Sequence, residues 1–260
     1  MLRKVVVSAG IAFGLAFATT VPAAAIVGGS PAATDTAPYQ VSVLMEGWVG
    51  KSHACGGFLI GAKRVVTSAH CIAGATASKI EVRWGGLEKG KLPHSSGVSK
   101  VVVHPGWNAN TFANDVGILQ LSGSASETGT VRFAKLASSA PAPDTLATVT
   151  GWGRTQADDP SLPNALQETQ LPIRTFAACQ AAYPGPQTAP TSPDPVLGSG
   201  MLCAGSDDGG SGICTLDSGD PLTADGMVVG IASWSRGCGE PGSPSVFTDV
   251  AQVKSWAESQ

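Results

Sequence analysis

Short apolar runs recur along most of the chain, and turn-forming residues separate them. In the run at 40–44, Val41 and Val43 alternate with polar neighbours, as in a strand with one buried face. The other runs lie at 58–60, 64–68, 79–84, 98–103, 117–121, 146–151, 166–173, 227–233 and 245–250. Many short strands at this spacing predict an all-β barrel or sandwich. Only residues 251–259 have a helical pattern.

The first 25 residues differ from the rest of the chain. Arg3 and Lys4 precede a nearly apolar run over 5–18, and residues 23–25 are alanines of the kind that signal peptidase accepts. The run is too short to span a membrane. We therefore predict a secretory signal peptide over residues 1–25, and the alternative is a buried N-terminal helix.

Charge and cysteine content narrow the classes of partner and compartment. The chain has 16 basic and 19 acidic residues, without a basic cluster that could neutralise phosphates, so nucleic acid is excluded as a partner. Six cysteines in an exported chain predict three disulfides, although the sequence alone leaves their pairing open. Metal ligation by these cysteines is the alternative, but no Cys-x-x-Cys pair occurs.

A serine, a histidine and an aspartate each lie in a local sequence suited to catalysis. Ser218 lies in the glycine-rich loop at 210–222. Its hydroxyl becomes a useful nucleophile when a base takes its proton and backbone N–H groups bind the oxyanion. His70 follows an apolar strand and precedes Cys71, while Asp115 leads into another apolar strand, where burial requires a partner. Each has a structural alternative, but the order His, Asp, Ser favours catalysis.

Further motifs make the chain resemble the trypsin/chymotrypsin family of secreted serine proteases over residues 26–260. They are Ile-Val-Gly-Gly at 26–29, Cys-Gly-Gly at 55–57, Thr-Ser-Ala-His-Cys at 67–71, Gly-Trp-Gly at 151–153, Met-Leu-Cys-Ala-Gly at 201–205 and Ser-Trp at 233–234. The resemblance implies two packed six-stranded antiparallel β-barrels, about 26–137 and 138–250, and a short C-terminal helix at about 251–259. It also implies the disulfides Cys55–Cys71, Cys179–Cys203 and Cys214–Cys238.

The same resemblance assigns the catalytic roles. Ser218 is the nucleophile, His70 the base and Asp115 the carboxylate that orients the base. The N–H groups of Leu216 and Ser218 form the oxyanion hole. Ser233 supports the aspartate.

An activation pair is also implied, between the α-amino group of Ile26 and Asp217. Family precursors commonly carry lysine or arginine before the isoleucine, whereas Ala25 stands here. We therefore expect signal peptidase to expose the Ile26 amine directly, without a separate zymogen.

Two residues of the serine loop depart from the family pattern, which has glycine at both positions. Leu216 is strained by about 1–2 kcal/mol if its φ is positive, and its side chain crowds the leaving-group side. Asp220 either faces solvent or finds a local donor. These departures keep an alternative function open, that of an inactive protease homologue acting as a binding protein.

The substrate pocket is expected to suit apolar side chains. Trypsin-like members carry an aspartate at the position of Gly212, and its absence argues against basic specificity. The predicted substrate-binding residues are Gly212, Ile213, Ser233, Trp234, Ser235 and Ser245. Because Ser235 and Ser245 narrow the pocket, we expect elastase-like cleavage after small or medium apolar residues, with chymotrypsin-like preference second.

The predicted protein is a secreted, extracellular endopeptidase and a monomer. Its partners are polypeptide substrates and protein protease inhibitors. No cofactor, no metal and, after signal removal, no membrane contact are expected.

Overall fold

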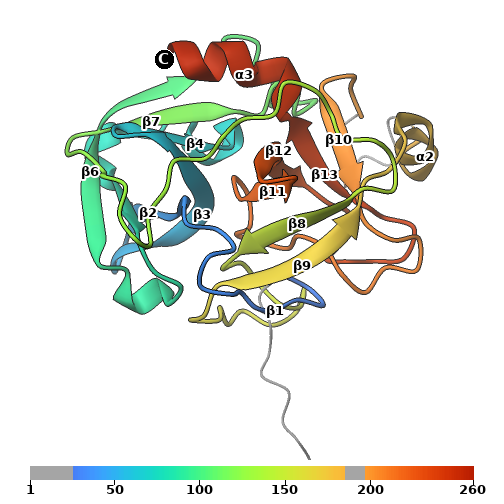
Figure 1. Cartoon of the computed structure of the whole chain (residues 1–260), viewed down its shortest axis with the longest axis horizontal. Helices are drawn as coiled ribbons and strands as arrows, with labels where there is room; N and C mark the ends of the chain where they lie inside the picture. Colours follow the sequence, from blue (N-terminus) through green and yellow to red (C-terminus); the bar gives the residue numbers. More distant parts are fainter. Residues whose placement is uncertain (1–25, 185–196) are drawn as a thin grey trace, which may run out of the picture.

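The structure, a computed structural model, describes residues 26–184 and 197–260. The predicted signal peptide lies outside the described residues. Two sheets stand side by side, one built from the first half of the described chain and one mainly from the second (Figure 1). Within the two described ranges, no helix is long and apolar enough to cross a membrane.

The first sheet is a closed barrel of six antiparallel strands in the order β2-β3-β4-β7-β6-β5. Its strands are β2 (Gln40–Gly47), β3 (Gly50–Gly61), β4 (Arg64–Thr67), β5 (Ile80–Trp84), β6 (His94–Val103) and β7 (Gly117–Leu121). Strand β5 shows how the sequence specifies the barrel. Ile80, Val82 and Trp84 are buried in its core, while the intervening Glu81 and Arg83 are only partly buried. This alternation places one face of the strand inside.

The second sheet has seven strands in the order β1-β9-β8-β11-β12-β13-β10. They are β1 (Ser30–Pro31), β8 (Leu146–Gly151), β9 (Gln167–Pro172), β10 (Met201–Ala204), β11 (Pro221–Ala224), β12 (Met227–Trp234) and β13 (Ser245–Asp249). The Gly205 N–H donates to the Pro172 carbonyl at 3.0 Å and the Arg174 N–H to the Cys203 carbonyl at 2.8 Å. These bonds link β9 with β10, so six strands curl toward closure and the short β1 adds a seventh at the edge. The predicted all-β fold is confirmed with that difference.

Within residues 26–184 and 197–260, three α-helices accompany the sheets, whereas the sequence pattern indicates only the last one. Helix α3 (Val250–Ser259) buries Val253 and Ala257 against the sheets, and the Asp249 carboxylate caps it by accepting from the Ala251 N–H at 3.0 Å. Helices α1 (Ala69–Ile72) and α2 (Phe176–Ala182) are too short to show a repeating apolar face. The described part of the chain also contains two 3₁₀ turns, Ala77–Lys79 and Lys89–Lys91.

Disulfides anchor the two short helices and the serine loop. Within the described residues the cysteines pair as Cys55–Cys71, Cys179–Cys203 and Cys214–Cys238, as the family resemblance implies. The first joins α1 to β3, and the second joins α2 to β10.

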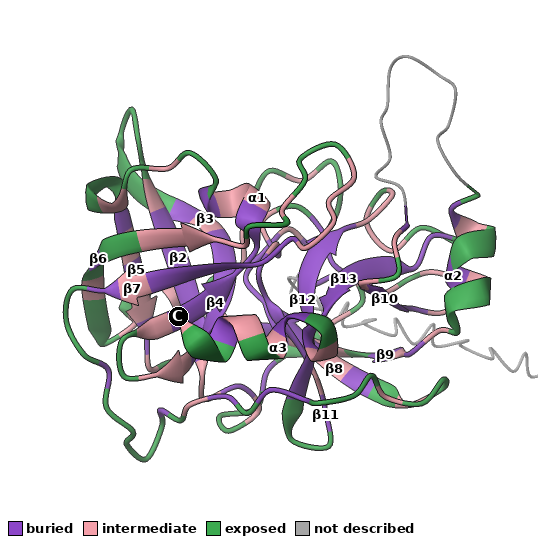
Figure 2. Cartoon of the chain, turned by 90° about the horizontal axis from the view of Figure 1, so that it is seen from above, coloured by how far each residue is buried: buried purple, intermediate pink, exposed green. Residues whose placement is uncertain are grey.

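A shared apolar cluster joins the two sheets. Phe58 and Val66 of the first sheet pack in one cluster with Val228 and Ile231 of the second. Figure 2 shows the buried strands meeting at the centre of the molecule, with exposed turns around them. The end of β4 and the start of β7 therefore lie beside the second sheet, where side chains from both sheets can meet.

Candidate active site

His70 and Asp115 meet where β4 and β7 pair. Thr67 lies opposite Gly117 in this antiparallel pair, so the segment that leaves β4 runs beside the segment that enters β7. His70 Nδ1 lies 2.7 Å from Asp115 Oδ2, and the His70 backbone N–H donates to Asp115 Oδ1 at 2.8 Å. Because an ionised carboxylate only accepts, Nδ1 carries the proton and Nε2 is left as the basic nitrogen.

Hydroxyl groups from the second sheet complete the bonding of Asp115. Its side chain is fully buried. Ser233 Oγ of β12 donates to Asp115 Oδ2 at 2.6 Å, and Thr248 Oγ1 of β13 donates to the Asp115 carbonyl at 3.0 Å. A buried carboxylate is tolerated when such donors satisfy it, so the two sheets together hold the orientation of His70.

The Ser218 backbone is held from both sheets. The Gly56 N–H of β3 donates to the Ser218 carbonyl at 2.8 Å, and the Gly219 N–H donates to the Ala232 carbonyl of β12 at 2.8 Å. Cys71 Sγ lies 3.8 Å from the Ser218 carbonyl oxygen and 3.8 Å from His70 Nε2. The structure thus brings the serine loop and the imidazole to the same disulfide.

Leu216 adopts the left-handed conformation that the sequence analysis considered, with φ of 75°. An L-residue there costs about 1–2 kcal/mol. The backbone N–H groups of Leu216 and Ser218 make no hydrogen bond to any described residue. Two unused donors on one tight turn are the kind of groups that bind a developing oxyanion.

The Leu216 carbonyl is held from the first sheet by a histidine. His53 Nε2 lies 3.2 Å from this carbonyl oxygen, and His53 Nδ1 lies 2.8 Å from Ser42 Oγ. Since a carbonyl only accepts, Nε2 carries the proton and Nδ1 accepts from the serine hydroxyl. Burial, followed by the charge of Lys89, lowers the pKa of His53 to about 4, so the ring is neutral near pH 7.

Asp217 and Asp220 are both fully buried behind the serine loop. Asp217 accepts from the Gly153 N–H at 2.8 Å and the Cys214 N–H at 2.9 Å. Burial nevertheless raises the pKa of Asp217 to about 7. The sequence left two environments open for Asp220, exposure to solvent or a bond to a local donor. Asp220 accepts from Gln40 Nε2, so the prediction of a solvent-exposed side chain is wrong. Burial, followed by the charge of Asp217, raises the pKa of Asp220 well above its usual range.

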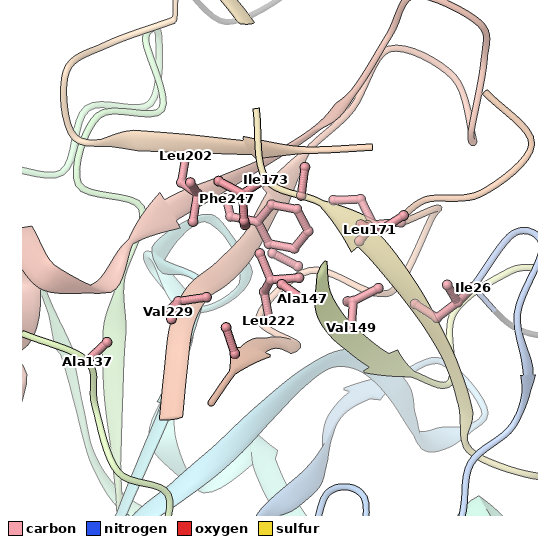
Figure 3. Close-up of a cluster of buried hydrophobic side chains, with 14 residues drawn as sticks. Ile26, Ala137, Ala147, Val149, Leu171, Ile173, Leu202, Leu222, Val229 and Phe247 are labelled. Atoms are coloured by element: carbon pink, nitrogen blue, oxygen red, sulfur yellow. The ribbon is translucent and has the colours of Figure 1, made fainter. Parts of the chain in front are cut away.

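Ile26 is buried near this pair of acids. Its side chain is fully buried in an apolar cluster that includes Val149 and Leu171 (Figure 3). The next residue, Val27, pairs with Gly212 through two backbone hydrogen bonds of 3.0 and 3.2 Å. The start of the described chain is therefore fixed to the segment that leads into the serine loop.

A pocket of about 370 Å³ opens beside Ser218. Of the six residues predicted to bind substrate, Ile213, Ser233, Trp234 and Ser235 line it. The other two lie behind this lining: Ser245 is buried, its Oγ accepts from the Ile213 N–H at 3.0 Å, and it lies beside Gly212. Ser235 Oγ donates to the Gly237 carbonyl at 2.7 Å. Among the described residues that line the pocket, none carries a charge.

Sequence reasoning missed three residues around the site. Thr248 supports the Asp115 backbone, Gln40 bonds Asp220, and the Phe112 ring lies 5.4 Å from the His70 ring between centroids. Only Gln40 leaves a signal, because strand alternation places it on the same face as Ser42, opposite the apolar face of β2. The other two reach the site through contacts between distant parts of the chain.

Known proteins match this chain in sequence over nearly all of the described residues. A sequence model of the trypsin family matches residues 26–257. The chain is 34% identical to trypsin delta of Drosophila melanogaster over 231 residues, covering 89% of this chain and 86% of that protein. It is 35% identical to trypsin of Sus scrofa over 236 residues (90% and 94%). It is 36% identical to serine protease 1 of Canis lupus familiaris over 239 residues (90% and 88%).

Proposed function

Since the chain belongs to the trypsin family and is a serine endopeptidase, we propose that Ser218, His70 and Asp115 are the residues that cleave its polypeptide substrates. The observation that carries this proposal is the 2.7 Å contact between His70 and the buried Asp115, beside the Ser218 loop. In this mechanism Ser218 Oγ attacks the scissile carbonyl while His70 Nε2 takes its proton. The imidazole then delivers the proton to the leaving amine, and Asp115 stabilises the imidazolium.

The oxyanion of the tetrahedral intermediate is bound by the N–H groups of Leu216 and Ser218. Their lack of partners among the described residues supports this role. Loss of one such donor typically costs about 100- to 1,000-fold in kcat. The positive φ of Leu216 is then the conformation that leaves its N–H unpaired, at the expense of local strain.

We further propose cleavage after small or medium apolar residues. The apolar Ile213 and the uncharged lining of the pocket support this preference, as does glycine rather than aspartate at position 212. The trypsin names of the relatives favour the competing hypothesis, cleavage after lysine or arginine. A basic side chain in this pocket would lack a carboxylate partner among the lining residues.

A peptide library separates these two specificities. The purified protein should cleave fluorogenic peptides with Ala, Val or Leu before the scissile bond, and the Ser218→Ala variant should be inactive on the same set. Contrasts of about 10- to 200-fold between apolar side chains are expected. Higher kcat/KM on the Lys and Arg peptides would contradict the proposed specificity while leaving the catalytic residues in place.

We propose that residues 1–25 direct secretion and that cleavage after Ala25 makes Ile26 the first residue of the mature enzyme. Three disulfides among the described cysteines support an oxidising compartment. N-terminal sequencing of protein from the culture medium tests the proposal. A start at Ile26 is expected, and a start several residues upstream would contradict it.

A further inference from the structure

Asp220 is the buried acid for which the mechanism above has no role. It lies two residues after Ser218, where the family pattern has glycine, and its side chain is fully enclosed. A Cβ atom on Gly56 would collide with the Asp220 carboxylate, so the glycine of the Cys-Gly-Gly motif makes room for it. Thr150 Oγ1 donates to Gln40 Oε1 at 2.8 Å, and Gln40 Nε2 donates to Asp220 Oδ1, so this oxygen is fixed by a polar chain.

The second oxygen of Asp220 faces Asp217. A Cβ atom on Gly151 would meet Asp217 Oδ1 and Asp220 Oδ2 at the same time, so the two carboxyl groups are close neighbours. Asp220 Oδ2 is buried and has no donor when both groups are ionised, whereas a protonated Asp220 hydrogen-bonds to Asp217. Two adjacent buried carboxylates do not both ionise readily, since like charges and burial each disfavour the second charge.

No basic side chain neutralises the pair within the described residues. Neither acid makes an ion pair or a hydrogen bond with lysine, arginine or histidine there, and the buried His53 ring is neutral and engaged with Ser42 and Leu216. Ile26, in contrast, reaches the same place. Its Cδ1 lies 3.1 Å from the Cβ position on Gly151 that both acid oxygens would meet. The cation that can enter this site is therefore the α-ammonium created at Ile26.

We propose that Asp220 is a positioning residue, the second carboxyl group of a two-acid receptor for the Ile26 α-ammonium. At neutral pH, Asp217 and Asp220 share one proton. The amine carries a second titratable proton, which makes it an ammonium. As pH rises, the shared proton leaves first and the ammonium then lies between two negative charges. Its own proton is lost only at a higher pH. This inference rests on the proposed function in taking Ile26 as the mature N-terminus.

The alkaline limb of kcat/KM tests the receptor, because Asp220→Asn keeps an N–H donor toward Asp217 but removes the second charge. The apparent pKa of the alkaline limb should move to lower pH by about one unit or more in this variant, as expected for removal of a neighbouring charge in a protein interior. Asp220→Gly, which restores the family residue, should shift the limb in the same direction. Asp225→Asn is the matched control, an identical change in the exposed β11–β12 turn, and should leave the limb unchanged.

Coinciding limbs for the parent and both Asp220 variants would overturn the inference, as would an equal shift in Asp225→Asn. A second measurement does not depend on activity. In the Ser218→Ala background, infrared spectra at pH 7 should contain the carbonyl stretch of a buried carboxylic acid, and Asp220→Asn should remove it. Absence of this difference would refute the shared proton.

These measurements separate failure of the inference from failure of the proposed function. If an active-site phosphonate did not label the parent, the proposed catalytic role of Ser218 would be wrong, and the infrared comparison alone would decide the acid pair. If the mature chain began upstream of Ile26, the ammonium's role would be refuted together with the proposed processing.

Discussion

Replacing Leu216 by glycine separates two effects that this side chain has on the serine loop. Its φ of 75° costs an L-residue about 1–2 kcal/mol, and glycine removes that cost. Glycine also raises the entropy of the unfolded chain, which lowers stability by about 0.5–1 kcal/mol. The net stabilisation of Leu216→Gly is thus between about 0 and about 1.5 kcal/mol, and each 1 kcal/mol corresponds to about 2–4 °C in Tm for a chain of this size.

The kinetic effect comes from the bulk of the side chain. Leu216 is half-buried, and we expect a bulky residue on the leaving-group side of the substrate to displace it. Forcing a side chain away from its rotamer costs about 0.5–1.5 kcal/mol. Its removal should therefore raise kcat/KM on such substrates by up to about tenfold. The same contact should weaken tight-binding protein inhibitors in the parent enzyme, and Leu216→Gly should bind them better.

The assay compares two peptides that differ only in the first residue after the scissile bond, glycine or phenylalanine. Leu216→Ala is the matched control, because it removes most of the bulk but keeps the Cβ atom and its conformational cost. Both variants should have a higher kcat/KM on the phenylalanine peptide than the parent, and only Leu216→Gly should have a higher Tm. Unchanged kcat/KM ratios in both variants would refute the steric argument. A lower Tm for Leu216→Gly than for Leu216→Ala would refute the strain argument.

Three other substitutions test separate contacts. Ser233→Ala removes a donor to the Asp115 carboxylate, and since such bonds contribute about 1.5–3 kcal/mol, kcat should drop at least about tenfold; unaltered steady-state kinetics would count against that support. Gly56→Ala should destabilise the parent by about 1–3 kcal/mol through collision with Asp220 but be nearly neutral beside Asp220→Gly, whereas additive effects in denaturant melts would exclude the collision. The pKa of His53 is about 4 in the folded protein and lies below its ordinary value of 6.5, so the unfolded chain takes up a proton more readily. The free energy of unfolding therefore decreases as the pH falls from 6.5 to 4. His53→Gln should remove that decrease, and parallel stability curves for parent and variant would show that the ring does not contribute.

The sequence predicts the strands well where one face is apolar and the strand is bounded by turns. The bounds predicted for 117–121 and 146–151 are those of β7 and β8. Strand β11 was missed because it begins with Pro221, yet proline at the first position costs no ladder bond that the strand needs. Helices α1 and α2 were missed because their stability comes from disulfides and from packing rather than from a periodic apolar face.

The local motifs around His70, Asp115 and Ser218 could be located from the sequence because each lies beside a strand or a cysteine. The environment of Asp220 could not. Its burial depends on Gly56 in β3, on Gln40 in β2 and on the position of Asp217, which are brought together only by the packing of one sheet on the other. The sequence could not predict whether the φ of Leu216 is positive, because the backbone conformation of a loop depends on the contacts that hold it in place.

The most direct test of the account is covalent labelling of the purified mature protein with a sulfonyl fluoride or a peptide phosphonate, followed by peptide mass mapping. The account predicts a single adduct on Ser218, lost in Ser218→Ala and formed far more slowly in His70→Ala. An unlabelled protein, or an adduct on another residue that survives Ser218→Ala, would contradict the claim that these residues form the active site.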